Sequence, residues 1–138
     1  MQIDDFAADP TAQFFQTTRK QQRSYSFFSG APVNPEEAKK FVDELDQAYK
    51  LYLGRIFRVP TFYWSQRKIL NDIKKHYRTE HIALGPLFRK GLAELSRAQK
   101  ADGQMLAQDC IQLSDLIQKQ VDQIDAFRKA EQNKRARS

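Results

Sequence analysis

Residues 50–62 read KLYLGRIFRVPTF, and the expected fold is built around this stretch. Aromatic and aliphatic side chains are interleaved in it with cations, and the same mixture continues to residue 90. Residues 50–90 hold ten lysines and arginines against two acids, so the formal net charge of +6 comes from the middle third of the chain. A basic, apolar-cored segment of this kind favours a surface that binds an acidic partner.

The length and composition favour a single helical domain. The chain has 138 residues, with only five glycines and five prolines. The single cysteine excludes a disulfide within the chain and gives no indication of a secreted protein. No apolar run approaches the roughly 20 residues that cross a bilayer, so a membrane role is expected to be peripheral at most.

Residues 1–33 are expected to form an irregular N-terminal arm. Asp9-Pro10 can start a helix, and Phe14-Phe15 and Phe27-Phe28 would then anchor either a short helix or an extended arm. Residues 10–35 contain three cations and no acid, which is compatible with an internal targeting element. A basic arm that lies on the domain or on a partner is the favoured interpretation.

Three antiparallel helices are expected over residues 34–101. The first begins where Asn34 can cap the helix and Pro35 suits the first helical position, and it ends before Pro60. The second is expected over about residues 61–81, with its cations around an apolar face.

Residues beyond the second helix predict a third helix, a turn and a long C-terminal helix. Gly85-Pro86 is expected to break the chain and begin the third helix, and Asp102-Gly103 is expected to form a kink or a turn. Residues 102–138 are expected to hold a C-terminal helix and a basic tail. The apolar seam of this helix would pack on another helix of its own domain or of a neighbour; it consists of Leu106, Cys110, Leu113, Ile117, Ile124 and Phe127, with Gln120 as a polar break.

The predicted fold is therefore all-α: a three-helix antiparallel bundle with an extended C-terminal helix and an irregular N-terminal arm. No catalytic or metal-binding motif accompanies it. His76 and His81 are five residues apart and do not share a helix face as ligands four apart would. Cys110 lies on the apolar seam, where a buried, inert thiol is expected. We expect no enzyme, no metal and no directly bound cofactor.

Two functions of different classes are compatible with the residues alone. Phe62-Tyr63-Trp64 beside cations would suit stacking of nucleic-acid bases, although no nucleic-acid-binding signature supports this and the rings are expected in or near the core. A basic helical nucleic-acid-binding protein is therefore the alternative, and nucleic acid is not the expected partner. The seam over residues 106–127 would also support a self-assembling coiled-coil scaffold.

The middle of the chain, roughly residues 35–100, resembles the LYR-motif family of small mitochondrial three-helix proteins. Leu51-Tyr52 matches the opening of the family's Leu-Tyr-Arg motif, Arg58 the later basic residue and Phe62 the downstream phenylalanine. Tyr77-Arg78 matches the aromatic-arginine pair of the second helix.

This sequence also contains a stretch that resembles the third helix of the family, but it lacks the signature arginine of the motif. Residues 87–95, LFRKGLAEL, look like the family's third helix. Leu53 stands where the arginine belongs, and Arg55 lies close enough on the helix to substitute for it.

One subgroup, the LYR accessory subunits of mitochondrial NADH:ubiquinone oxidoreductase (complex I), is similar over a longer span. Residues 37–49 resemble its first helix, and Lys90-Gly91 with Glu94-Leu95 resemble its third. In this register the motif falls on residues 45–47, of which only Leu45 matches. The registers starting at Leu45 and at Leu51 exclude each other, and both remain open.

The resemblance implies a non-catalytic accessory or adaptor subunit on the matrix side of the mitochondrial inner membrane. It would bind the acylated mitochondrial acyl carrier protein and other subunits of a large assembly. Complex I is the favoured host, and an LYR adaptor of iron–sulfur assembly or of the mitoribosome is the alternative. The expected cofactor is the acyl-phosphopantetheine that the carrier itself holds.

Ten residues are expected to bind the carrier. The cations would meet its acidic helix and its phosphate through charge-assisted hydrogen bonds. Two aromatic residues, Tyr52 and Phe62, would line the entry of the acyl chain into an apolar channel between the three helices, where each buried methylene contributes about 0.8 kcal/mol. The expected set is Leu51, Tyr52, Arg55, Arg58, Phe62, Lys74, Lys75, Arg78, Arg89 and Lys90.

Overall fold

A computed structural model describes residues 9–57 and 65–137 of the chain. Within these residues the protein is all-α, as predicted, and no strand occurs. The elements in chain order are α2 (Pro10–Ser24), the short 3-10 helix η1 (Ser26–Ser29), α3 (Pro35–Phe57), α4 (Gln66–His76), α5 (Arg78–Lys100) and α6 (Ala107–Arg137).

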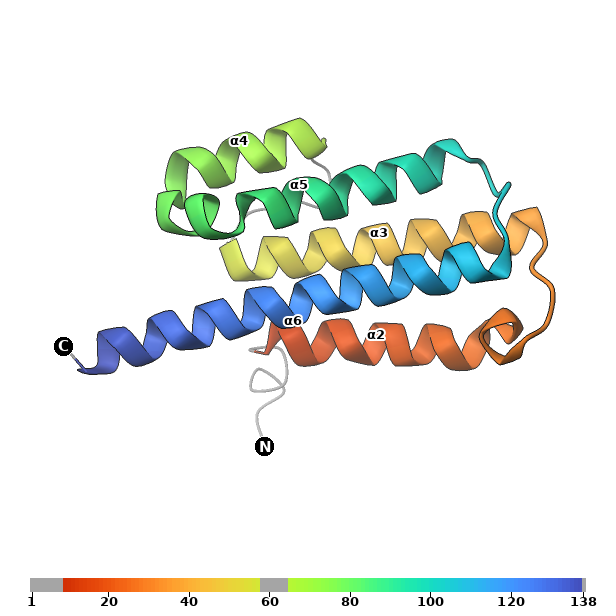
Figure 1. Cartoon of the computed structure of the whole chain (residues 1–138), viewed down its shortest axis with the longest axis horizontal. Helices are drawn as coiled ribbons and strands as arrows, with labels where there is room; N and C mark the ends of the chain where they lie inside the picture. The colour runs from red at the N-terminus through yellow and green to blue at the C-terminus, as the bar shows by residue number, and fades with distance from the viewer. Residues whose placement is uncertain (1–8, 58–64, 138) are drawn as a thin grey trace.

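Four long helices form the body of the molecule (Figure 1). α2 and α3 run antiparallel, as do α5 and α6, and α6 packs against α2, α3 and α5. α3 packs on α5, while α4 lies on α5 at the edge opposite α2. The arrangement therefore differs from the expected three-helix bundle, because α2 and α6 complete a four-helix body and α4 is added outside it.

The expectation of an irregular N-terminal arm is wrong over α2. Asp9 caps this helix, since its Oδ1 accepts a hydrogen bond from the Ala12 amide at 3.1 Å, and Pro10 lies in the first turn. Phe14 is buried against Tyr52 of α3, with the ring centroids 6.0 Å apart. α2 is thus part of the hydrophobic core.

Polar side chains on the buried face of α2 explain why its apolar periodicity is poor. Thr18 and Gln21 are both buried. The Thr18 hydroxyl donates to the Phe15 carbonyl at 3.1 Å, and Gln21 Nε2 donates to the Phe41 carbonyl at 3.4 Å. Buried polar groups need such partners, and their presence interrupts the apolar stripe that marks an amphipathic helix.

The start of α3 is as predicted. Asn34 Oδ1 accepts from the Glu37 amide at 2.8 Å, and Asn34 Nδ2 donates to Glu37 Oε1 at 3.0 Å. This reciprocal pair satisfies a backbone group that the first turn of a helix leaves free. α3 ends at Phe57, and the predicted stop at Pro60 lies outside the described residues.

The second helix is shorter than expected at its C-terminal end. α4 is capped by Ser65, whose Oγ accepts from the Lys68 amide at 3.2 Å, and it ends at His76. Tyr77 has non-helical backbone angles and is the single residue between α4 and α5. Its hydroxyl donates to the Phe57 carbonyl at 2.5 Å, which ties this joint to the end of α3.

The predicted break at Gly85-Pro86 is wrong, because α5 runs through it without interruption. A proline inside a helix removes one backbone hydrogen bond and costs about 3 kcal/mol relative to alanine. Leu84, Phe88 and Leu92 are buried on either side of it. Their packing holds the helix together where the local sequence alone would end it.

The turn expected at Asp102-Gly103 is present, with φ of 49° and 85°. A Cβ at Gly103 would lie 2.2 Å from the Pro35 carbonyl oxygen, so this position requires glycine.

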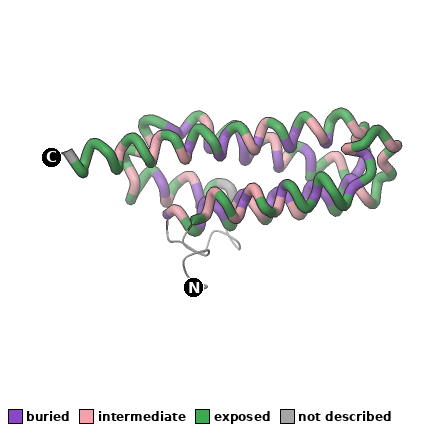
Figure 2. Tube along the Cα trace, turned by 90° about the horizontal axis from the view of Figure 1, so that it is seen from below, coloured by how far each residue is buried: buried purple, intermediate pink, exposed green. Residues whose placement is uncertain are grey.

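The apolar seam of α6 packs inside its own chain. Cys110, Leu113, Ile117 and Ile124 are buried, and so is the polar Gln120. Figure 2 shows the buried segments on the inward sides of the helices and the exposed C-terminal end of α6 beyond them. The seam is therefore occupied, which removes the observation behind a self-assembling scaffold. Two expected members differ: Leu106 precedes the helix and is 72 % exposed, and Phe127 is only partly buried.

Candidate functional site

α4 separates apolar from basic residues. Ile69 and Ile73 are buried in the core. A spacing of seven places Arg67 with Lys74, and Lys68 with Lys75, on one side of the helix. All four cations are exposed. The outer side of α4 is therefore positively charged, and its inner side is apolar.

α5 adds two arginines beside α4. Arg78 and Arg89 are exposed, and their separation of eleven residues is about three helical turns, so they lie on the same side of α5. Ile82, between them on this side, is 70 % exposed. We term Arg67, Lys68, Lys74, Lys75, Arg78 and Arg89 the basic face.

Few carboxylates accompany the basic face. The acids within residues 65–90 are Asp72 and Glu80, and Asp72 lies 3.8 Å from His76. Elsewhere the lysines are more often paired, as in Lys129 with Asp125 at 2.9 Å. In the described part of the chain, no carboxylate lies within 4.0 Å of the charged groups of Arg67, Lys74, Lys75, Arg78 or Arg89.

Lys90 does not belong to the basic face. It lines a groove of about 520 Å³ between α5 and α6, together with Met105 and Leu116. This groove lies on the side of α5 that borders α6. Lys90 is exposed, and it lines this groove together with Arg97 of α5, apart from Arg78 and Arg89.

Three predicted residues lie on the α2 side of α3. Leu51 is 42 % exposed and Arg55 is hydrogen-bonded to Gln13 of α2. Tyr52 is only 1 % exposed beneath α2, so it does not line a surface entry. Since α2 and α4 lie at opposite edges of the molecule (Figure 1), the structure does not bring these residues together with Lys74. Arg58 and Phe62 lie outside the described residues.

Core side chains occupy the space where an apolar channel was expected between α3, α4 and α5. Tyr49, Leu53, Ile73, Phe88 and Leu92 are each at most 1 % exposed and belong to one hydrophobic cluster. An acyl chain entering this space would have to displace them. Among the described residues, the basic face is therefore a surface for charges, without an open channel beneath it.

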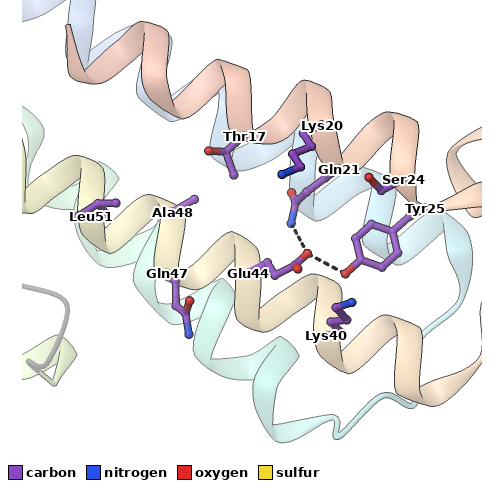
Figure 3. Close-up of a pocket in the computed structure, with 10 residues that line it drawn as sticks. All are labelled: Thr17, Lys20, Gln21, Ser24, Tyr25, Lys40, Glu44, Gln47, Ala48 and Leu51. Atoms are coloured by element: carbon purple, nitrogen blue, oxygen red, sulfur yellow. Dashed lines mark hydrogen bonds between the residues drawn. The ribbon is translucent and has the colours of Figure 1, made fainter. Parts of the chain in front are cut away.

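A polar groove between α2 and α3, of about 560 Å³, was not anticipated (Figure 3). The Tyr25 hydroxyl donates to Glu44 Oε1 at 2.7 Å, and Gln21 Nε2 donates to the same oxygen at 3.4 Å. Burial and the Glu44 carboxylate raise the pKa of Tyr25 above its usual range, so the hydroxyl remains a donor. In the sequence, only the spacing of four residues between Gln21 and Tyr25 indicated that these two side chains lie on one side of a helix. This spacing is informative only once α2 is known to be a helix.

The cysteine is buried, as expected from its place on the seam. Burial, with a smaller contribution from Asp109, raises the pKa of Cys110 from 9.0 to about 11. Such a thiol is a poor nucleophile at neutral pH. Among the described residues, no group of three or more His, Cys, Asp or Glu side chains forms a ligand set, and no helix is long and apolar enough to cross a membrane.

A scan against protein-family models gave no match, and neither did comparisons with curated proteins and with solved structures. The resemblance to the LYR-motif family stays a prediction.

Proposed function

We propose that this chain is a non-catalytic adaptor that binds an acidic protein through its basic face. The observation that carries the proposal is the set of exposed cations on α4 and α5, five of which have no carboxylate partner among the described residues. Carboxylates of a partner would pair with these cations through charge-assisted hydrogen bonds. The exposed Ile82 supplies an apolar contact between Arg78 and Arg89.

The partner that the resemblance implies is the acylated mitochondrial acyl carrier protein. Its acidic helix would lie along the lysines of α4, and its phosphopantetheine phosphate would suit the bidentate geometry of Arg78 or Arg89. Complex I is the host assembly that we favour, with iron–sulfur assembly and the mitoribosome as alternatives. In this proposal Leu51 and Arg55 do not share the contact, because they lie on the α2 side.

The test is native mass spectrometry of the chain co-expressed with a mitochondrial acyl carrier protein, followed by titration of the purified components. The carrier is supplied with an acylated arm, an unacylated arm or none. We expect a one-to-one complex with the acylated carrier. A complex that forms equally without the arm would keep the basic face as the site and exclude acyl-dependent recognition. No complex in any state would overturn the proposal for this partner.

A pair of matched variants locates the site. Lys74→Glu with Lys75→Glu reverses two charges on the basic face and should weaken binding by at least about tenfold, since like charges across an interface repel. Arg19→Glu with Lys119→Glu changes the net charge equally on exposed positions of α2 and α6 and should leave binding unchanged. Equal loss in both variants would show attraction by net charge alone.

Nucleic acid is the second candidate, because the same unpaired cations would also suit phosphates. Its binding would weaken steeply with salt and depend little on the oligonucleotide sequence. Carrier binding would instead depend on the acyl arm. A salt titration with a short duplex and with the carrier therefore separates the two functions.

A further inference from the structure

We propose that the groove between α5 and α6 is a contact surface for a second copy of this chain. The groove has a volume of about 520 Å³ and is lined by both helices and by the turn that joins them. None of the six residues of the basic face lines it, so the inference is independent of the proposed function. It is also not the contact that the apolar seam of α6 suggested, because that seam packs inside the chain.

The floor of the groove is apolar, and an exposed apolar side chain lies beside it. Ala98, Leu113 and Leu116 line the groove, and Leu116 is only partly buried. Leu106 lies next to the groove, because its amide donates at 2.9 Å to Oδ2 of Asp109, a lining residue. Leu106 is 72 % exposed, more than any other large apolar residue that the structure describes. A contact that covers Leu106 and the floor would remove this apolar surface from water.

The two ends of the groove carry opposite charges. α5 and α6 run antiparallel from the turn that joins them, so Asp109 lies close to this turn (Figure 1). Lys90 is eleven residues before Ala101, which places it about 16 Å from the turn along α5. Among the described residues, Lys90 has no carboxylate within 4.0 Å and Asp109 has no cation within 4.0 Å. Each end therefore has a charge that a partner could pair.

These features are self-complementary about a two-fold axis through the middle of the groove. In a two-fold contact the same patch of both copies meets itself in the reverse direction. Asp109 of each copy then lies opposite Lys90 of the other copy. Leu106 of each copy lies over the floor beside Leu116 of the other copy. The dimer would therefore contain two ion pairs and two apolar contacts.

The charge of the groove favours a second copy, although the chain as a whole is basic. With a net charge of +6, two copies repel each other, most strongly across the basic face. The groove has two bases and two acids, and its inner pair, Glu94 and Arg97, already forms a salt bridge at 3.1 Å. A partner of one charge sign gains little from such a surface. A second copy supplies both signs in the matching order.

The test is sedimentation equilibrium of the full-length chain at micromolar to millimolar concentrations. We expect a reversible monomer–dimer equilibrium. Leu106→Ser should raise the dissociation constant by at least about tenfold, since each dimer loses two apolar contacts. Ile82→Ser is the matched control, because Ile82 is 70 % exposed and does not line the groove. It should leave the dissociation constant unchanged.

A second pair of variants tests the ion pairs. Lys90→Glu places a carboxylate opposite Asp109 of the other copy and should also raise the dissociation constant by at least about tenfold. Arg19→Glu makes the same change in net charge at an exposed position of α2 and should not weaken the dimer. All four substituted positions are exposed, so folding should be retained. A chain that stays monomeric, a dimer that neither groove variant weakens, or equal losses in the matched controls would overturn the proposal.

Discussion

The hydroxyl of Tyr49 on α3 donates a 2.9 Å hydrogen bond to Gln120 Oε1 on α6, in the middle of the core. Both side chains are buried. Gly91 of α5 completes this contact, because a Cβ there would lie 2.2 Å from Gln120 Oε1. Burial raises the pKa of Tyr49 well above its usual range, so the donor stays protonated. One polar contact therefore joins α3 and α6 at a point where α5 has no side chain.

Gln120→Leu should destabilise the protein by about 1–3 kcal/mol, because it leaves the Tyr49 hydroxyl buried without an acceptor. Tyr49→Phe removes the donor, and the double variant removes both. The double variant should be more stable than the sum of the single losses predicts. Urea unfolding of the four proteins measures this coupling. Strictly additive losses would show that the hydrogen bond contributes no coupling energy.

Phe14→Ala should cost about 3–5 kcal/mol, the range for removing a buried phenylalanine ring. Phe14 is 3 % exposed, although it lies in a region that the sequence suggests is an arm. An exposed residue two positions further along α2 gives the control: Gln16→Ala should change the free energy of unfolding by no more than about 0.5 kcal/mol. Chemical denaturation measures both. A Phe14→Ala protein as stable as the control would contradict the packing of α2.

Pro86→Ala should stabilise the protein by about 1–3 kcal/mol, since it restores an amide inside α5 and removes the helix penalty of proline. Pro86 is exposed, so the change leaves the core intact. Pro35→Ala is the matched control, because Pro35 occupies the first position of α3, where proline is tolerated. Thermal unfolding compares the two. A fall in the midpoint for Pro86→Ala would argue for a different conformation at this position.

Alkaline pH should destabilise the protein partly through Cys110. The pKa of this thiol rises from 9.0 to about 11 in the folded protein, so above pH 9 the unfolded state loses a proton that the folded state keeps. Stability contributed by the neutral thiol is complete below pH 9 and is lost as the pH rises to about 11. The slope approaches about 1.4 kcal/mol per pH unit within this window.

Cys110→Ala should remove this part of the pH dependence, whatever it does to stability at pH 7. Urea unfolding of both proteins at several values between pH 8 and pH 11 gives the two slopes. Parallel pH profiles would show that the thiol has the same pKa in both states. Tyr52, whose pKa burial raises from 10.0 to about 12, should lower the stability of both proteins from pH 10 upward, so the difference between the two profiles reports Cys110.

Local signals predicted the parts of the fold that local interactions decide. Asn34 was identified as a helix cap from the residues around it, and it accepts the expected backbone hydrogen bond. Asp9-Pro10 was noted only as a stretch that can start a helix, within an arm expected to be irregular, and Asp9 is in fact a cap. The seam of α6 was visible as apolar spacing. The continuity of α5 through Pro86 was not predictable in this way, because packing on the body of the protein outweighs the local preference of proline.

The basic face shows the same limit for function. The charge of α4 and α5 was evident in the sequence, and Lys74, Lys75, Arg78 and Arg89 are indeed exposed. The sequence did not show that these cations lie far from Leu51 and Arg55, because that distance depends on which side of α3 is covered by α2. The polar groove could not be found from the sequence, since one wall belongs to a helix whose buried face is polar.

The packing of the first helix against the last has a consequence for biosynthesis. Thr11 at the start of α2 donates a 2.8 Å hydrogen bond to Asp125 in α6, across 114 positions of the chain. The body of the protein therefore cannot close until α6 has left the ribosome. During translation the apolar sides of α2, α3 and α5 that face α6 stay exposed until α6 is made. We therefore expect a chain that stops before residue 110 to expose this surface and to aggregate.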